Sequence, residues 1–369
     1  MVGTHRLLFL YTWSPLTVLL VGLCWLTVIS SCQKLPEKKD YLSTNAGFNR
    51  EDIYEPVLGR TTLKLTEFNA DASTYPLRFT IINTRHAKDG TPAPELMQKS
   101  KVMEWRRNYT GYERSLDEIN EKRIWVEKPF LDIREGSGDF IFWNASQSLI
   151  HSYPDEGYLF DVKVENKGNA RVFTDFHLRP VKAVPYEPYE YDLYTREQKQ
   201  EDRTSPDGTS YSVPFIIHPT FINNMYYTED SLFQDTLVSV YFHRNDKSSA
   251  QTLTFRFLDE DFNPINPDRF TPLDWNGLEP VVWDSLVHGF DINKSASELT
   301  YQVAYPIPLT QLNTRYASDG KAHVAFGYSR KGFGGRRVDA SFGLEFSIYQ
   351  PGDWVIIFYF RRNPIFTDA

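Results

Sequence analysis

FGLEFSIYQPGDWVIIFYF, residues 342–360, decides the fold class. Its first half alternates apolar residues with small or polar ones, which is typical of a strand with one buried face. Gln350-Pro351-Gly352-Asp353 then places proline and glycine where a type II turn prefers them. The stretch therefore predicts a β-hairpin that closes the chain. Residues 354–360 are apolar on both faces, which predicts a central strand of a β-sandwich.

Residues 160–178 repeat this pattern on either side of a turn at Lys167-Gly168-Asn169 and predict another hairpin. Aromatic residues, 15% of the chain, fall mostly in strand-like contexts. One helix is predicted as an insertion between strands, because Ser115 and Glu118 form a capping box. We expect an all-β, mainly antiparallel fold: two β-sandwich, immunoglobulin-like domains with one short inserted helix. Six further strands are predicted at residues 77–83, 140–143, 237–243, 252–258, 301–305 and 323–328.

A polar stretch indicates the domain boundary. Residues 195–210 lack apolar periodicity and contain Pro206-Asp207-Gly208, and long polar stretches are uncommon inside a compact domain. We therefore expect a linker there. The predicted organisation is a signal peptide at 1–31, a lipidated cysteine and spacer at 32–60, an N-terminal sandwich at 61–194, the linker at 195–210, and a C-terminal sandwich at 211–369.

The N-terminal residues have the parts of a secretion signal. Arg6 precedes a long uncharged apolar segment, and Pro15 limits its effective core to residues 16–29. An uncleaved membrane anchor is the alternative, because residues 7–29 are long enough to span a bilayer. Ile29-Ser30-Ser31-Cys32 resembles the lipobox of bacterial lipoproteins, which implies cleavage before Cys32 and lipidation of its thiol. Gln33 follows where an aspartate would imply retention at the inner membrane, so the resemblance implies an outer-membrane protein.

Charge and cysteine content exclude several function classes. Removal of residues 1–31 takes away one arginine and no acid, so the net charge changes from −8 to −9 over the remaining 338 residues. This balance argues against a nucleic-acid groove, which needs a basic stripe. Cys24 leaves with the signal peptide and Cys32 carries lipid. No cysteine then remains for a disulfide or a thiolate metal site.

No catalytic motif is found, and neither a metal nor another cofactor is expected. The histidines lack the spacing of a helical zinc site. Asp259, Asp261 and Asn263 begin like a calcium loop, but Pro264 and Phe270 stand where that loop needs glycine and glutamate. We therefore expect a protein that is not an enzyme. The alternative is a glycan-active hydrolase whose carboxylates converge only in space.

Two groups of residues are candidates for ligand binding. One is a row of tyrosines interleaved with acids, which could stack on sugar rings or, alternatively, pack a domain junction. The other is a set of cations around the glycines of residues 330–337, which could meet anionic sugars or a partner's acidic surface. The alternative for that loop is a hairpin connection with glycines at positive φ. The candidate residues are Tyr186, Tyr189, Tyr191, Tyr194, Arg330, Lys331, Arg336 and Arg337.

Together with the lipobox and the lysine-rich spacer, FNREDIYEPVLGRTTL (residues 48–63) and SRKGFGGRRVDASFGLEFSIY (residues 329–349) resemble a lipoprotein family of unknown function. That family is associated with SusC/SusD-type glycan-uptake systems. The resemblance covers nearly the whole mature chain. It implies a lipid-anchored outer-membrane protein, displayed at the cell surface in preference to the periplasmic face, that captures a glycan beside a TonB-dependent transporter without covalent chemistry. A structural subunit of the transporter complex is the remaining alternative.

Overall fold

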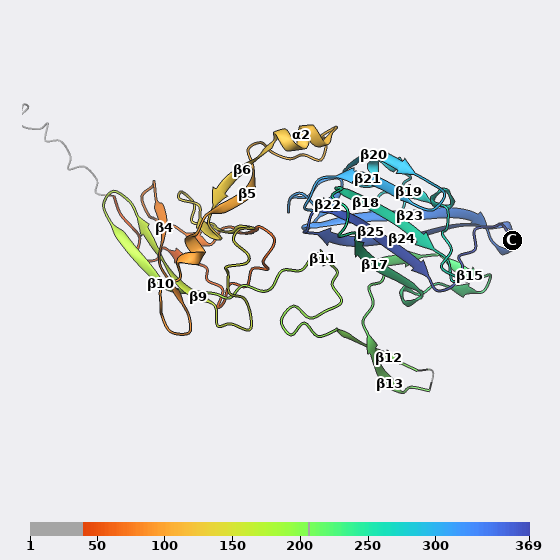
Figure 1. Cartoon of the computed structure of the whole chain (residues 1–369), viewed down its shortest axis with the longest axis horizontal. Coiled ribbons are helices and arrows are strands. Elements are labelled where there is room, and N and C mark those ends of the chain that lie inside the picture. The colour runs from red at the N-terminus through yellow and green to blue at the C-terminus, as the bar shows by residue number, and fades with distance from the viewer. Residues whose placement is uncertain (1–39, 206) are drawn as a thin grey trace, which may run out of the picture.

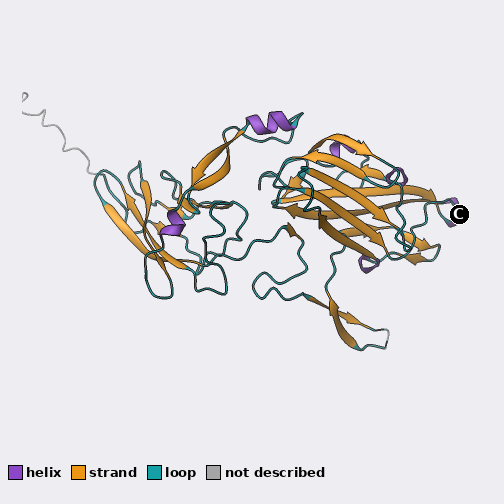
Figure 2. Ribbon diagram, in the orientation of Figure 1, coloured by secondary structure: helices purple, strands orange, loops and turns teal. Residues whose placement is uncertain are grey.

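The computed structural model describes residues 40–205 and 207–369. Cys32, the predicted signal peptide and the first part of the predicted spacer lie outside these residues. The described chain is all-β with a single α-helix, as predicted, and its strands form several mainly antiparallel sheets (Figures 1 and 2). None of its helices is long and apolar enough to cross a membrane.

The N-terminal unit is built on the antiparallel sheet β10-β9-β4. The predicted hairpin at 160–178 is confirmed: β9 (Tyr158–Glu165) pairs with β10 (Ala170–Leu178), with Phe160 opposite Phe176. Alternate residues of β9 face a core that is rich in phenylalanine. The remaining strands are β4 (Arg78–His86), β1 (Gly47–Phe48) paired with β3 (Phe68–Asn69), and β8 (Phe140–Phe142) between β2 (Thr62–Lys64) and β7 (Leu131–Ile133).

The first described residues are held at the β9–β10 turn. Tyr41 and Thr74 exchange hydrogen bonds, because the Tyr41 amide donates to Thr74 Oγ1 (3.1 Å) and the Thr74 amide donates to the Tyr41 carbonyl (2.7 Å). Asn169 Nδ2 donates to the Asp40 carbonyl (3.0 Å). The chain therefore enters the molecule at the end of the N-terminal unit that lies away from the C-terminal unit (Figure 1).

A two-stranded ribbon leaves the N-terminal unit and carries the helix. It consists of β5 (Ser100–Trp105), α2 (Leu116–Glu121) and β6 (Arg123–Lys128), and we call residues 100–128 the arm. The serine half of the predicted capping box is confirmed, since Ser115 Oγ accepts from the Glu118 amide (3.1 Å). The Glu118 carboxylate reaches one residue further back than expected, to the Arg114 amide (2.8 Å). The arm extends toward the C-terminal unit (Figure 1).

Two sheets of the C-terminal unit enclose the larger hydrophobic core. Phe342 and Phe358 meet across it, with ring centroids 5.4 Å apart. The first sheet contains β11 (Tyr186–Glu187), β24 (Arg337–Ile348), β23 (Lys321–Lys331) and β19 (Thr271–Leu273), joined by β14 (Phe221–Asn223) and β22 (Ala317–Ser318). The second has the order β17 (Val238–Arg244), β25 (Asp353–Phe360), β18 (Thr252–Leu258), β21 (Leu299–Val303) and β20 (Gly289–Lys294).

The predicted hairpin at 342–360 is wrong. Both strands form, but β24 lies in one sheet and β25 in the other, so residues 349–352 carry the chain across the sandwich. Alternation shows that each strand has a buried face, and it does not show which strand lies alongside. The predicted central position of β25 is confirmed, because it lies between β17 and β18 and runs parallel to β18.

The segment predicted as a linker contains regular structure. β12 (Gln200–Thr204) pairs with β13 (Ser210–Pro214) in a hairpin that projects from the molecule (Figure 1). Ahead of it, β11 is already hydrogen-bonded to β24. A second small hairpin, of β15 (Tyr226–Thr228) and β16 (Ser231–Leu232), follows later in the chain.

Candidate functional site

The arm presents one aromatic face. The β5–β6 register pairs Met103 with Trp125 and Trp105 with Arg123, so these four side chains share a face of the ribbon. The opposite face carries Val102 and Val126, which pack on the N-terminal unit. Trp125 therefore points outward and is 66% exposed. We call this side of the ribbon the aromatic face; it consists of the exposed Lys101, Trp125 and Glu127 and the half-buried Met103, Trp105 and Arg123.

Arg123 fixes the base of the aromatic face. Its guanidinium lies over the Trp105 ring (5.8 Å to the centroid) and donates to Asn120 Oδ1 from Nη2 (2.7 Å). Nη1 donates to the carbonyl of Tyr305 (3.0 Å), a residue of the C-terminal unit. Burial removes water from the Arg123 cation and lowers its pKa. The two hydrogen bonds replace part of the water that the cation has lost. One side chain thus orients Trp105 and joins the arm to the sandwich.

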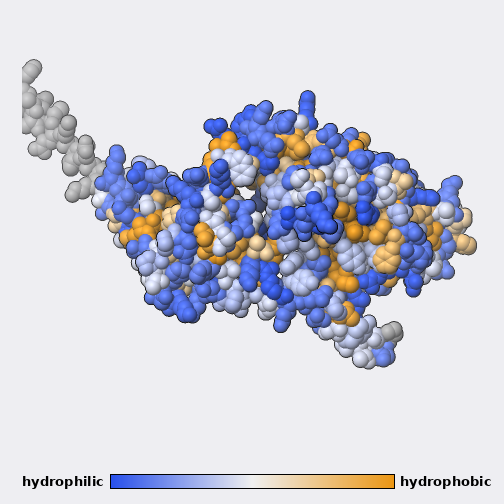
Figure 3. Space-filling model, viewed as in Figure 1, coloured by the Kyte–Doolittle hydropathy of each residue, from blue (hydrophilic) through white to orange (hydrophobic). Residues whose placement is uncertain are grey.

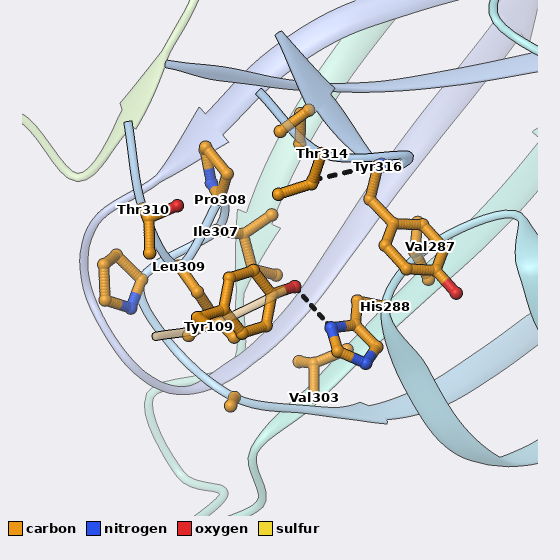
Figure 4. A pocket seen from close by; sticks show the side chains of 14 residues that line it. Tyr109, Val287, His288, Val303, Ile307, Pro308, Leu309, Thr310, Thr314 and Tyr316 are labelled. Atoms are coloured by element: carbon orange, nitrogen blue, oxygen red, sulfur yellow. Dashed lines mark hydrogen bonds between the residues drawn. The ribbon is translucent and has the colours of Figure 1, made fainter. Parts of the chain in front are cut away.

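Tyr109 and His288 form the main polar contact between the arm and the C-terminal unit. The Tyr109 hydroxyl meets His288 Nδ1 (Figure 4). His288 Nε2 lies 2.9 Å from the Glu113 carbonyl. A carbonyl can only accept, so Nε2 carries the proton and Nδ1 accepts from the tyrosine. His288 is thereby held as one neutral tautomer. Burial also lowers the pKa of His288 from its ordinary value of 6.5. The Tyr316 ring stacks on the imidazole at 4.9 Å.

Glu113 organises the loop that presents Tyr109. Its carboxylate accepts from the amides of Thr110 (3.0 Å) and Gly111 (2.9 Å) and forms an ion pair with Lys122. Burial alone would raise the pKa of Glu113, but the Lys122 ion pair and the Thr110 hydrogen bonds outweigh it and lower the pKa to about 2. The Glu113 carboxylate therefore connects the loop before α2, through Thr110 and Gly111, to Lys122, the residue that follows α2.

A pocket lies where the arm meets the sandwich (Figure 4). We call it the junction pocket; it holds about 450 Å³ of empty space, including its open mouth. Tyr109 forms the wall from the arm, and the other walls come from the C-terminal unit. They combine apolar side chains with a few polar groups, as small-molecule sites do. The walls from the C-terminal unit include Val303, Ala304, Ile307, Leu309, Thr310, Thr314 and Tyr316.

The four predicted tyrosines do not form an exposed row. Tyr186 stacks on Phe242 (4.6 Å between centroids) and bonds Glu190 through its hydroxyl, and Tyr189 packs on a small cluster that includes Val181. Tyr191 and Tyr194 are 41% and 38% exposed. The Tyr194 hydroxyl donates to Glu55 Oε2 (2.8 Å). Tyr186 therefore packs beside the C-terminal sheets, and Tyr189 packs on a cluster that joins Val57 and Val181 to Tyr349.

The predicted cations around 330–337 also divide. The loop is a β23–β24 hairpin with Gly334 and Gly335 at positive φ, as the alternative prediction held. Arg330 is buried and donates twice to the Glu229 carboxylate (2.8 and 3.2 Å). Arg337 pairs with Asp339 (2.8 Å). Lys331, Arg336 and an 88% exposed Phe333 lie at the tip, and the backbone of Lys331 is fastened by the Asp368 carboxylate.

The residues of the arm and the junction pocket were not predicted as a site. Tryptophans on alternating strands are as often core as surface, and periodicity alone does not tell which face of a ribbon turns outward. Charge does not distinguish the faces either, because Lys101 and Glu127 lie on the tryptophan side and Glu104 and Lys128 on the opposite side. Within residues 40–205 and 207–369, no group of three acids or histidines is placed to hold a metal ion.

No curated protein and no solved structure is significantly similar to this chain. A family model described as a domain of unknown function, DUF5007, matches residues 68–368, which include the arm and both sheets of the C-terminal unit. The expected membership of a family of unknown function is confirmed at this level. The link to lipoproteins and to SusC/SusD-type systems stays a prediction. The chain belongs to the DUF5007 family.

Proposed function

We propose that this protein is a lipid-anchored outer-membrane binding protein that captures a glycan on the aromatic face of its arm, beside a SusC/SusD-type transporter and without covalent chemistry. The observation that carries the proposal is the outward Trp125, on one ribbon face with Trp105. A flat exposed indole stacks on the apolar face of a pyranose ring. Lys101 and Glu127 flank it as groups that can bond sugar hydroxyls.

The position of the predicted anchor agrees with capture. The described chain starts at the end of the N-terminal unit away from the C-terminal unit (Figure 1). A lipid at Cys32, only a few residues before Asp40, would therefore hold that end at the membrane. The arm and the junction pocket would then stand away from the bilayer. Hydrophobic residues on the viewed face lie in separate areas among hydrophilic ones (Figure 3), which suits a body held by its lipid anchor.

Affinity electrophoresis tests glycan capture. The full-length chain, extracted in detergent, would be run through gels that each contain one polysaccharide of a neutral and anionic panel. We expect retardation by at least one polysaccharide, and Trp125→Ala to weaken it about tenfold because stacking is lost. Tyr241→Ala is the matched control, since it removes an aromatic residue that is 41% exposed on β17. Retardation of Trp125→Ala equal to that of the wild type would contradict the proposal.

A second function, as a structural subunit of the transporter complex, is supported by the β23–β24 tip. Phe333 is 88% exposed above a base braced by Arg330–Glu229 and by Asp368. An exposed aromatic side chain among cations suits an apolar pocket with an acidic rim on a partner protein. This function predicts copurification with a SusC/SusD pair that Phe333→Ala weakens and that added sugars do not alter.

A further inference from the structure

We propose that the junction pocket receives a methyl group carried by the terminal residue of the captured glycan and so selects a residue that has one. The methyl group would belong either to a 6-deoxy sugar or to an acetylated sugar. This inference rests on the proposed glycan capture and adds to it the class of sugar recognised. It follows from the position of the pocket, its lining and its free hydroxyl groups.

The pocket continues the aromatic face. The Trp105 ring lies 5.4 Å from that of Tyr109, and Tyr109 is the wall that the arm contributes to the pocket. Arg123 adds a second connection, because it covers Trp105 and bonds the carbonyl of Tyr305, next to Pro306 in the pocket wall. A sugar chain that stacks on Trp125 and follows the aromatic face past Trp105 would therefore end at the pocket.

The lining favours a sugar that is partly apolar. Val303, Ala304, Ile307 and Leu309 offer no hydrogen bonds from their side chains. A hydroxymethyl group placed against them would lose its bonds to water without replacement. A methyl group in the same place gains free energy from burial instead. The empty space of about 450 Å³ includes open solvent at the mouth, so the enclosed part admits a small group such as a methyl group, while the sugar ring itself stays at the mouth.

Two threonines in the lining offer polar groups for the ring hydroxyls. Thr314 Oγ1 accepts from the Tyr316 amide (3.2 Å), and Thr310 Oγ1 accepts from the Leu312 amide (3.3 Å). A hydroxyl that accepts from an amide keeps its own proton to donate. The two threonines can therefore donate to sugar oxygens while their own orientation is fixed. The pocket thus combines an apolar wall with a pair of oriented donors.

Matched pairs of free sugars test this inference. L-fucose would be compared with L-galactose, which differs by one 6-hydroxyl group, and N-acetyl-D-glucosamine with D-glucose, which lacks the acetamido group. Binding to the detergent-extracted full chain would be followed by saturation-transfer NMR. We expect about tenfold tighter binding of the methyl-bearing member in at least one pair, with the strongest transfer to its methyl protons. A preference in the fucose pair assigns a deoxy sugar, and one in the glucosamine pair assigns an acetylated sugar.

Two variants locate the effect. Thr310→Phe would fill the pocket and is expected to abolish the preference, whereas Gln311→Phe adds the same ring at the adjacent exposed position and should leave it intact. Thermal unfolding of both variants verifies that each is folded. Equal binding of both sugars in both pairs, or a preference that survives in folded Thr310→Phe, would overturn the inference. If polysaccharide retention that depends on Trp125 persists in that case, glycan capture stands; if the wild type retains no polysaccharide, both fail.

Discussion

At the scale of single residues, Glu113 shows how the arm keeps its shape. Its side chain is fully buried, and Lys122 neutralises it while backbone amides occupy both oxygens. A buried pair of this kind stabilises little compared with apolar packing, but removal of one partner leaves an uncompensated charge. The effect of the pair is therefore seen most clearly when Lys122 is replaced.

We predict that Lys122→Met lowers the free energy of unfolding by about 3 kcal/mol at pH 7. The pKa of Glu113 is depressed in the folded protein, so its contribution is present above about pH 4.5 and is lost as pH falls toward 2. The difference between wild type and variant should therefore shrink at pH 3. Denaturant titrations at both pH values measure this difference.

Lys128→Met is the control. The Lys128–Glu104 ion pair (3.4 Å) is more exposed than the Lys122–Glu113 pair, so its loss should cost about 1 kcal/mol or less. An equal loss in both variants would argue against this role of Glu113.

At the scale of elements, docking of the arm depends on neutral His288. The groups around it are Tyr109, Glu113, Glu118, Arg315 and Tyr316. Because burial lowers its folded pKa, His288 contributes stability above its ordinary pKa of 6.5, and that contribution is lost as pH falls below it. Acid should therefore loosen the arm before it unfolds the sandwiches.

We predict faster amide hydrogen exchange in residues 106–122 at pH 5.5 than at pH 7.5, after correction for the intrinsic rate. β18 should keep its protection, because its pairing with β21 and β25 holds it inside the sandwich. In His288→Gln the pH dependence of the arm should disappear. An arm protected equally at both pH values would contradict this prediction.

β24 depends on a glycine where β14 pairs with it, because Gly343 lies opposite Phe221. A Cβ on Gly343 would lie 2.4 Å from Phe221 Cε1 and 2.9 Å from the Val324 carbonyl oxygen, which cannot move aside. We predict that Gly343→Ala destabilises the protein by about 1–3 kcal/mol through overpacking. Gly136→Ala, where nothing lies within 4 Å, should change stability little. Thermal unfolding compares the two, and similar melting temperatures would show that β14 is not packed as described.

Local patterns in the sequence were enough for the elements and not for their partners. Residues 252–258 form β18 with the predicted bounds, and Ser115 caps α2, because alternation and capping are local signals. Which sheet a strand joins depends on contacts between residues that are far apart in the sequence. Alternation alone therefore wrongly predicts that β24 pairs with β25, whereas the two strands lie in different sheets. The junction pocket needed Tyr109 and His288 together, 179 residues apart, and no local pattern reports such a contact.

At the scale of the whole molecule, we propose that Cys32 decides where the protein works. The predicted modification joins a lipid to that thiol, and stable anchoring takes more than one acyl chain. We predict that the wild-type protein sediments with outer membranes and that Cys32→Ala does not. Mass spectrometry should find an acylated Cys32 at the mature N-terminus. An N-terminus that retains residues 1–31 would contradict the anchor and leave the binding face untouched.

The central claim is that the arm binds a glycan and leaves its bonds intact. The most direct measurement incubates the full-length protein with a polysaccharide that retards it and follows bound polysaccharide and new reducing ends in the same sample. We predict saturable binding that Trp125→Ala weakens about tenfold, with no reducing ends above the level without protein. Reducing ends that increase with protein concentration, or binding that is indifferent to Trp125, would contradict the claim.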